Sequence, residues 1–129
     1  MRRIGIGLIS AALLVGSVGA ACSQDVAKVS PRTTKVIFEN AYIRVIQSTF
    51  PPGAREPIHT HPAGWYYVTR GGTLKVTGAD GKSENWQVTS GHNEWGDGEA
   101  PHEAVNVGRK EMEYLLVEVK GAPTKIPKP

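Results

Sequence analysis

The segment "GAREPIHTHPAGWYYVTRGG", residues 53–72, joins a closely spaced histidine pair to an aromatic, β-rich run. Side chains two positions apart on a strand point to the same face, so His59 and His61 can direct both imidazoles into one cavity. On its own, a His-x-His pair is more often solvated surface than a pair of ligands. Whether this pair binds a metal therefore depends on what the rest of the chain builds around it.

The surrounding sequence predicts a single all-β domain. The chain has 129 residues, 40% hydrophobic and 21% charged, as in an ordinary globular protein. No stretch shows sustained helical periodicity. The clearest turn is Ala79-Asp80-Gly81-Lys82, because Asp-Gly tolerates the positive φ angles of a tight hairpin. Many short strands without a covering helix favour an antiparallel sandwich or barrel. The β-rich segments are KVIFEN (35–40), YIRVIQSTF (42–50), WYYVTRG (65–71), TLKVTG (73–78), ENWQVTS (84–90), HEAVNVG (102–108) and EMEYLLVEVK (111–120).

A second motif, "GHNEWGDGEAPHEAVN" at residues 91–106, follows the first after about 40 residues and contains His102. Together the two motifs resemble those of the cupin family, whose first motif is a glycine, five residues, His-x-His, a glutamate and a closing glycine. Gly53, His59 and His61 match the start of that pattern. The resemblance covers roughly residues 34–120. It implies an antiparallel double-stranded β-helix, the jelly-roll or cupin barrel, over residues 33–120.

The three histidines are the predicted metal ligands. On neighbouring strands of a small barrel, His59, His61 and His102 would form a facial set of three nitrogens. Neutral imidazole suits Fe, Zn, Cu, Ni and, less strongly, Mn, so the cofactor is predicted only as a divalent transition metal. Three protein ligands leave room for water or a substrate, which is the arrangement of a catalytic site.

The sequence departs from the cupin pattern where the first motif should supply a glutamate. Residues 63–66 are Ala, Gly, Trp and Tyr, so no carboxylate is available there. Three interpretations stay open. The centre can consist of three histidines, as in cupins that act as dioxygenases. Alternatively, Glu94, Asp97 or Glu99 replaces the missing ligand, or the metal is lost and a binding pocket remains.

Other polar and aromatic residues give weaker indications. His92 fits no motif position and is interpreted as a surface or loop residue, and Asn106 as a residue that bonds the backbone. Trp65 and Tyr67 share one strand face, opposite Tyr66, so one side of this strand could line a cavity. No general base is obvious in the sequence. Tyr67 and Glu94 are the weak candidates for a catalytic role.

The N-terminal residues predict export. Residues 1–21 have a charged start, a short apolar run and small residues, as in a signal peptide. The apolar run is shorter than the roughly 20 residues of a membrane span. Cys22 is the only cysteine, so it is either lipidated as in a bacterial lipoprotein or lies beside an ordinary cleavage site. The predicted location is the periplasm or the membrane surface. Residues 22–32 are interpreted as a linker and 121–129 as a Pro- and Lys-rich tail.

Charge and composition limit the partners. Residues 33–119 contain 8 basic and 11 acidic residues, so nucleic acid is an unexpected partner, and a membrane is expected only through a lipid anchor.

We expect a metal-dependent dioxygenase or isomerase acting on a small anionic or oxygen-bearing substrate. The neutral ligand set would leave the ion positive and so favour anions. The alternative is a non-catalytic cupin that binds or senses a metal or small ligand. Edge strands of a small open barrel also predict a homodimer.

Overall fold

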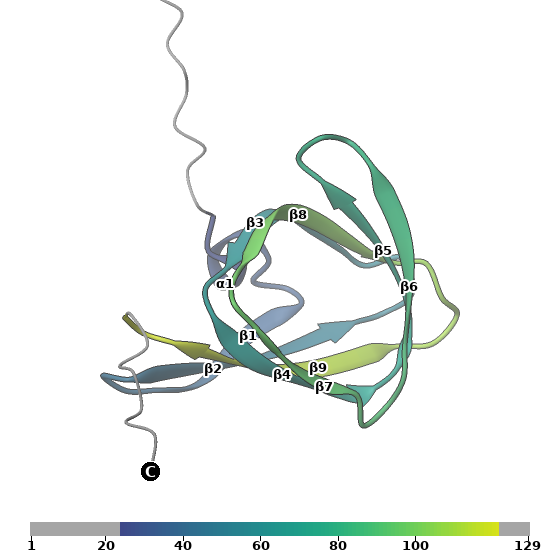
Figure 1. Ribbon diagram of the computed structural model, residues 1–129. Coiled ribbons are helices and arrows are strands. Elements are labelled where there is room, and N and C mark those ends of the chain that lie inside the picture. Colours follow the sequence, from purple (N-terminus) through teal and green to yellow (C-terminus); the bar gives the residue numbers. More distant parts are fainter. Residues whose placement is uncertain (1–23, 122–129) are drawn as a thin grey trace, which may run out of the picture.

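The structure, a computed structural model, describes residues 24–121 and is built almost entirely of β-strands. Two antiparallel sheets, ordered β1-β2-β9-β4-β7 and β3-β8-β5-β6, curve around a common interior (Figure 1). This double-stranded β-helix confirms the predicted fold class. The elements are α1 (Val26–Val29), β1 (Thr34–Glu39), β2 (Ile43–Phe50), β3 (Arg55–His61), β4 (Gly64–Arg70), β5 (Gly72–Gly78), β6 (Ser83–Val88), β7 (Asn93–Gly96), β8 (Glu99–Asn106) and β9 (Met112–Val119).

The interior is lined by alternate residues of the central strands. On β9, Met112, Leu116 and Glu118 are buried on the face that points inward, and on β2 the same alternation buries Ile46 and Phe50. One core cluster forms around Ile46 and Leu116 and a second around Phe50 and Met112. The two-residue period of a strand thus turns the apolar pattern of the sequence into an inner wall.

The predicted hairpin is confirmed. Gly78 N donates to Lys82 O at 2.9 Å, and Gly81 has a φ angle of 79°, which an L side chain would resist. Asp80 Oδ1 accepts a bond from Lys82 N at 3.0 Å and closes the turn between β5 and β6. The turn chemistry of Asp-Gly therefore fixes the register of these two strands.

Strands β3 and β7 lie outside the seven β-rich segments of the sequence. β3 contains Pro57, which a strand accommodates at an edge or a bulge. Both conditions hold, since β3 is an edge strand and its pairing with β8 shifts register between Glu56 and His59. β7 is only four residues long and forms the edge of the other sheet.

The segment interpreted as a linker, residues 22–32, contains the short helix α1 and packs against the domain from residue 24 onward. Asp25 caps α1 by accepting a bond from Ala27 N at 3.0 Å, and Val26 is buried in the core. Asp25 also pairs with Arg44 of β2 at 2.7 Å. One helical turn is too short to give a periodic signal, which explains why the sequence pattern missed it.

The predicted signal peptide, Cys22 and residues 122–129 of the predicted tail lie outside the described residues. Within residues 24–121, no helix is long and apolar enough to cross a membrane.

Candidate metal centre

The structure brings His59, His61 and His102 together inside the barrel. His59 and His61 come from β3, and His102 lies directly opposite His59 on β8. The ring centroid of His59 is 4.7 Å from that of His61 and 4.5 Å from that of His102. One candidate ligand atom from each residue lies within 4.8 Å of the other two. We call this group the histidine cluster.

Backbone carbonyls hold two of the imidazoles in the tautomer that a metal requires. His59 Nδ1 lies 2.7 Å from Pro57 O, and His102 Nδ1 lies 2.8 Å from Ala100 O. A carbonyl oxygen only accepts, so each Nδ1 carries the hydrogen and each neutral ring keeps its lone pair on Nε2. His59 Nε2 lies 3.0 Å from His61 Nε2, a separation that favours a shared proton or a common cation.

Burial keeps His59 neutral. Its side chain is 1% exposed, and desolvation lowers its pKa to about 4, although the bond to Pro57 O acts in the opposite direction. The lone pair of His59 is therefore free at neutral pH. Three converging imidazoles, two of them held in a fixed orientation, fit a divalent transition metal.

Each histidine has a glutamate beside it. Glu56 Oε2 lies 3.6 Å from His59 Nε2, Glu118 Oε1 lies 3.5 Å from His61 Nδ1, and Glu99 Oε2 lies 3.3 Å from His102 Nε2. Sequence reasoning missed Glu56 and Glu118. These carboxylates remove the reason for expecting an anionic substrate, because they offset the positive charge of an ion bound by neutral ligands.

Two β-bulges bring Glu56 and Glu99 to the cluster. In a regular strand, residues three apart point to opposite faces. At the first shift, β3 advances three residues, from Glu56 to His59, while β8 advances only two. At the second shift, β8 advances three residues, between His102 and Glu99, while β3 advances only two. Each extra residue rotates a glutamate onto the face of its histidine. No spacing rule would have identified Glu56, because a regular strand places it on the other face.

Of the three residues proposed to replace the missing ligand, only Glu99 lies at the cluster. Glu94 Oε2 instead accepts a bond from Tyr66 Oη at 2.9 Å, and Asp97 Oδ1 accepts one from Trp95 Nε1 at 2.9 Å. Glu99 lines the cavity beside the histidines and its side chain is 38% exposed. Glu99 is therefore the carboxylate available as an additional ligand.

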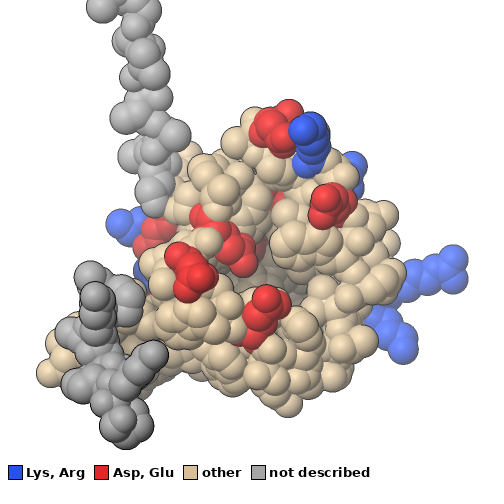
Figure 2. All heavy atoms as spheres, in the orientation of Figure 1, with Lys and Arg blue, Asp and Glu red and all other residues tan. Residues whose placement is uncertain are grey.

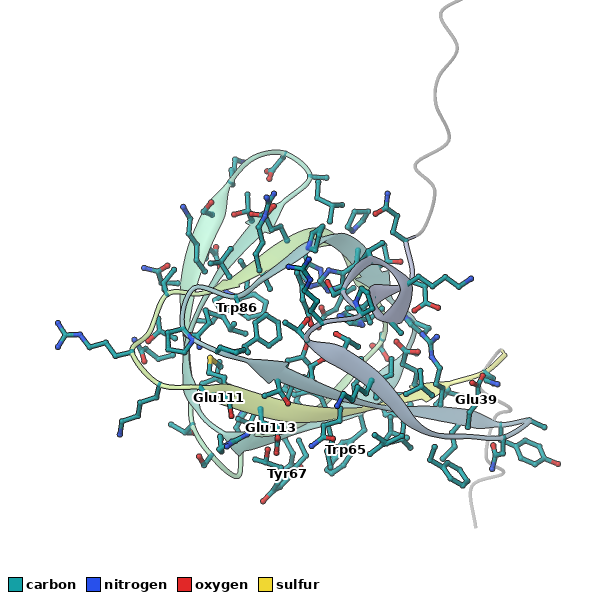
Figure 3. All side chains as sticks on the ribbon, turned by 180° about the vertical axis from the view of Figure 1, so that it is seen from behind. Glu39, Trp65, Tyr67, Trp86, Glu111 and Glu113 are labelled. Carbon is teal, nitrogen blue, oxygen red and sulfur yellow. The ribbon has the colours of Figure 1, made fainter. Side chains whose placement is uncertain are left out.

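The two catalytic candidates from the sequence lie away from the histidine cluster. Trp65 and Tyr67 point outward from β4, whereas Tyr66 on the opposite face lines the cavity (Figure 3). Tyr67 is therefore misplaced for a general base. Glu94 lies nearer the opening of the barrel, with Tyr66 and His92. Burial, and then the bond to Glu94, raise the pKa of Tyr66 to about 12, so this phenol is a hydrogen-bond donor at neutral pH.

Buried polar groups behind the cluster hold Glu56 and Glu118 in place. Glu56 is fully buried, accepts a bond from Thr34 Oγ1 at 2.8 Å and lies 3.4 Å from Tyr114 Oη. Burial raises the pKa of Glu56. Glu118 Oε2 accepts a bond from Arg44 Nε at 2.7 Å, while its Oε1 faces His61 Nδ1. Glu118 Oε1 and His61 Nδ1 have no hydrogen-bond partner among the described residues. The two atoms face each other at 3.5 Å.

Asn106 bonds the backbone, as the sequence predicted. Its side chain is buried and its Nδ2 donates to Phe50 O and Lys110 O, both at 2.8 Å, while its Oδ1 accepts a bond from Gly108 N. Asn106 therefore connects the ends of three strands and lies outside the candidate ligand set.

Two connected cavities lead from the histidine cluster to solvent. The inner cavity has a volume of about 100 Å³ and is lined by the three histidines, Glu56, Glu99 and mostly apolar side chains. The outer cavity has a volume of about 400 Å³ and opens at the surface. Tyr66, Trp86, Val88 and Glu99 line both. Figure 2 shows the hollow, surrounded by acidic side chains, with most Lys and Arg residues farther out.

Several solved structures with a similar fold are described as cupins. No protein-family model matches the sequence, and no curated protein is a significant match. A cupin domain from Bordetella pertussis is 24% identical with a TM-score of 0.62, over 68% of this chain and 92% of that one. A double-stranded β-helix protein from Klebsiella pneumoniae is 19% identical with a TM-score of 0.54, over 81% and 95%. The polyketide cyclase RemF from Streptomyces resistomycificus is 18% identical with a TM-score of 0.52, over 70% and 66%.

Proposed function

From the cupin fold of this chain, we propose that it binds one divalent transition metal through His59, His61 and His102 and acts on a small oxygen-bearing molecule in the inner cavity. The observation that carries this proposal is the convergence of three imidazoles, two of them held by backbone carbonyls with Nε2 toward the cluster. The residues fit a metal, and the space beside them is open to a small ligand.

We propose an enzyme of the dioxygenase or isomerase type as the leading function. The ion would supply Lewis acidity or a site for dioxygen. The chain itself would exclude water through the apolar wall of the inner cavity and orient the ligand against the histidine cluster. Glu99 is the carboxylate best placed to accept a proton from the ligand, because it lines the cavity and remains partly exposed.

A non-catalytic protein that binds or senses a metal or ligand is the second candidate. The observation that favours it is the position of the other two carboxylates, since Glu56 and Glu118 are buried within the protein and bonded to other side chains. Of the three carboxylates beside the histidines, Glu99 alone would then remain partly exposed. A fold shared by enzymes and binding proteins does not decide between the two.

The cellular setting is proposed from the sequence and from one exposed strand. We propose export to the periplasm, with Cys22 either lipidated or close to the cleavage site. We also propose a homodimer through β1. This strand forms the edge of the five-stranded sheet, and Val36, Ile37 and Phe38 are 42%, 52% and 51% exposed. An apolar edge of this kind is expected to be covered by a partner.

The proposal is tested by measuring metal content and turnover in the purified protein. We expect about one equivalent of transition metal by mass spectrometry, which His102→Ala removes and the matched variant His92→Ala retains. Oxygen uptake or isomerisation with small diketones and phenols supports the enzyme, and stoichiometric metal without turnover supports the binding protein. Wild-type protein that takes up no Fe, Mn, Zn, Ni or Cu at neutral pH refutes both.

A further inference from the structure

His61 differs from the other two histidines of the cluster in how its Nδ1 is held. Nδ1 of His59 and Nδ1 of His102 each face a backbone carbonyl oxygen, whereas His61 Nδ1 has no hydrogen-bond partner among the described residues. Because His61 Nε2 faces His59 Nε2 at 3.0 Å, Nδ1 is the nitrogen left for a protein partner. The group that it meets is Glu118 Oε1, at 3.5 Å. The orientation of this third imidazole therefore depends on what holds Glu118.

Arg44 of β2 holds Glu118 and connects it to the N-terminal segment. Arg44 and Glu118 lie directly opposite each other on β2 and β9, and Arg44 Nε donates to Glu118 Oε2 at 2.7 Å. The terminal nitrogens of the same guanidinium, Nη1 and Nη2, donate to the two carboxylate oxygens of Asp25 at 2.7 and 3.0 Å. A guanidinium is planar and rigid, so a displacement of Asp25 also changes the bond to Glu118. The side chains of Glu118, Arg44 and Asp25 are 3%, 18% and 25% exposed, so water screens these pairs only partly.

The N-terminal segment, residues 24–26, is fixed both to the strand that carries two of the histidines and to the core. Thr60, the residue between those two histidines, donates its backbone N–H to Gln24 O at 3.1 Å and forms an isolated parallel bridge with Asp25. Val26 is 1% exposed and belongs to a core cluster. Figure 1 shows α1 beside β3. The segment therefore reaches the histidine cluster by two routes, one through the backbone of β3 and one through side chains.

We propose that Asp25 and Arg44 are positioning residues for the candidate metal centre. Acting through Glu118, they hold the ring of His61 with Nε2 toward the cluster and Nδ1–H toward the carboxylate. A carboxylate that accepts the second N–H of a ligand histidine fixes the tautomer of the ring and raises its basicity. The inference rests on the proposed function, because it names what orients one of the three ligands. It makes the segment that directly follows the predicted export signal part of the metal centre.

The first test measures metal affinity in two variants that each remove one carboxylate charge from a pair with an arginine. Asp25→Asn removes the charge beside Arg44 but keeps a side chain that caps α1. Glu113→Gln is the matched control, because Glu113 pairs with Arg70 and is 20% exposed, against 25% for Asp25. Glu113 lies five residues from Glu118 on β9, hence on the opposite face of the strand.

In competition for zinc with a chromophoric chelator, Asp25→Asn should weaken binding by about 3- to 10-fold, less than the loss of a direct partner of the ligand. Glu113→Gln should leave zinc affinity unchanged. Equal losses in the two variants overturn the proposal, since they show that zinc affinity follows net charge.

The second test is a double-mutant cycle on zinc affinity. If Asp25 acts through Glu118, Asp25→Asn has no further effect in a Glu118→Gln background. Arg44→Lys keeps the positive charge but loses the planar donor set that joins the two carboxylates, so it should weaken zinc binding at least as much as Asp25→Asn. Urea unfolding of each metal-free variant checks that it is folded in the assay. A full additional loss on top of Glu118→Gln, or wild-type affinity in Arg44→Lys, overturns the proposal.

A measurement on metal-free protein separates this inference from the proposed function. Nitrogen-15 NMR of the imidazoles shows whether Nδ1 of His61 carries a hydrogen and how fast that hydrogen exchanges with solvent. We expect a hydrogen on Nδ1 in the wild type and faster exchange in Asp25→Asn, whereas exchange at His59 Nδ1, held by Pro57 O, stays the same.

The combined outcomes assign each failure to one proposal. A wild type that binds no metal but shows faster exchange at His61 in Asp25→Asn refutes the proposed function and supports the hold of Asp25 on His61. A protein that binds metal, with zinc affinity and exchange at His61 both unchanged in Asp25→Asn, refutes the inference and leaves the proposed function intact.

Discussion

The histidine cluster and the outer cavity are two ends of one passage, built in different ways. His59 is 1% exposed, and backbone carbonyls, buried carboxylates and the core around Met112 surround the cluster. At the outer cavity, Trp86 is about half exposed and lies on β6, an edge strand with one neighbour. The inner end is part of what stabilises the fold, whereas the outer end can change with little effect on stability. We therefore expect residues of the inner and outer ends to be replaceable independently of each other.

The largest expected contrast is in stability. Met112 is buried on the wall of the inner cavity, and Met112→Ala should lower the free energy of unfolding by about 2–5 kcal/mol, because it enlarges a cavity in the core. Trp86→Leu at the outer cavity should change it by less than about 1 kcal/mol. Urea unfolding measures both. Similar losses in the two variants would show that the outer end is as much a part of the core as the inner end.

Metal should stabilise the protein through the inner end alone. At a free zinc concentration of about 100 times the dissociation constant, the free energy of unfolding should rise by about 2.7 kcal/mol, since the folded state binds the ion. The rise should disappear in His102→Ala and persist in His92→Ala. Calorimetric melting with and without chelator checks this, and a zinc effect that survives His102→Ala would place the ion elsewhere.

The carboxylates of the two ends should differ in their effect on metal affinity. Glu118 faces His61 Nδ1 and is held by Arg44, so Glu118→Gln should weaken metal binding by about 10- to 100-fold. Glu94 bonds Tyr66 at the outer cavity, so Glu94→Gln should leave metal affinity unchanged. Competition with a chromophoric chelator measures both constants. If Glu118→Gln and Glu94→Gln weakened metal binding equally, metal affinity would depend only on the net charge of the protein.

The smallest predicted effect is a pH dependence of stability in metal-free protein. Because the pKa of His59 falls from 6.5 to about 4 on folding, the unfolded chain binds a proton more readily between these values. The stability contributed by neutral His59 is complete above pH 6.5 and is lost as the pH falls toward 4. Glu56, whose pKa is raised, acts in the opposite direction. The stability difference between wild type and His59→Gln, measured by urea titration at several pH values, should therefore shrink on acidification.

Much of the fold and half of the site could be predicted because they follow from local periodicity. The two-residue alternation of a strand places His59 beside His61, and the second motif supplies His102 on a paired strand. β-Rich composition identified most strands, and the turn chemistry of Asp-Gly identified the hairpin at Asp80-Gly81. Strand alternation also showed that Trp65 and Tyr67 lie opposite Tyr66, but it does not say which face of the strand is inside. The structure places Tyr67, a weak candidate base from the sequence, on the outward face with Trp65.

The sequence by itself determined an all-β barrel with three histidines on its strands, since each of these features is encoded within a few neighbouring residues. Tertiary structure alone decided the rest. Register shifts between β3 and β8 rotated Glu56 and Glu99 toward the cluster, and the closing of the sheets brought Trp86 of β6 and Glu94 of β7 to one opening. A bulge or an edge depends on how two distant strands pair, and a single strand carries no local record of its partner's register.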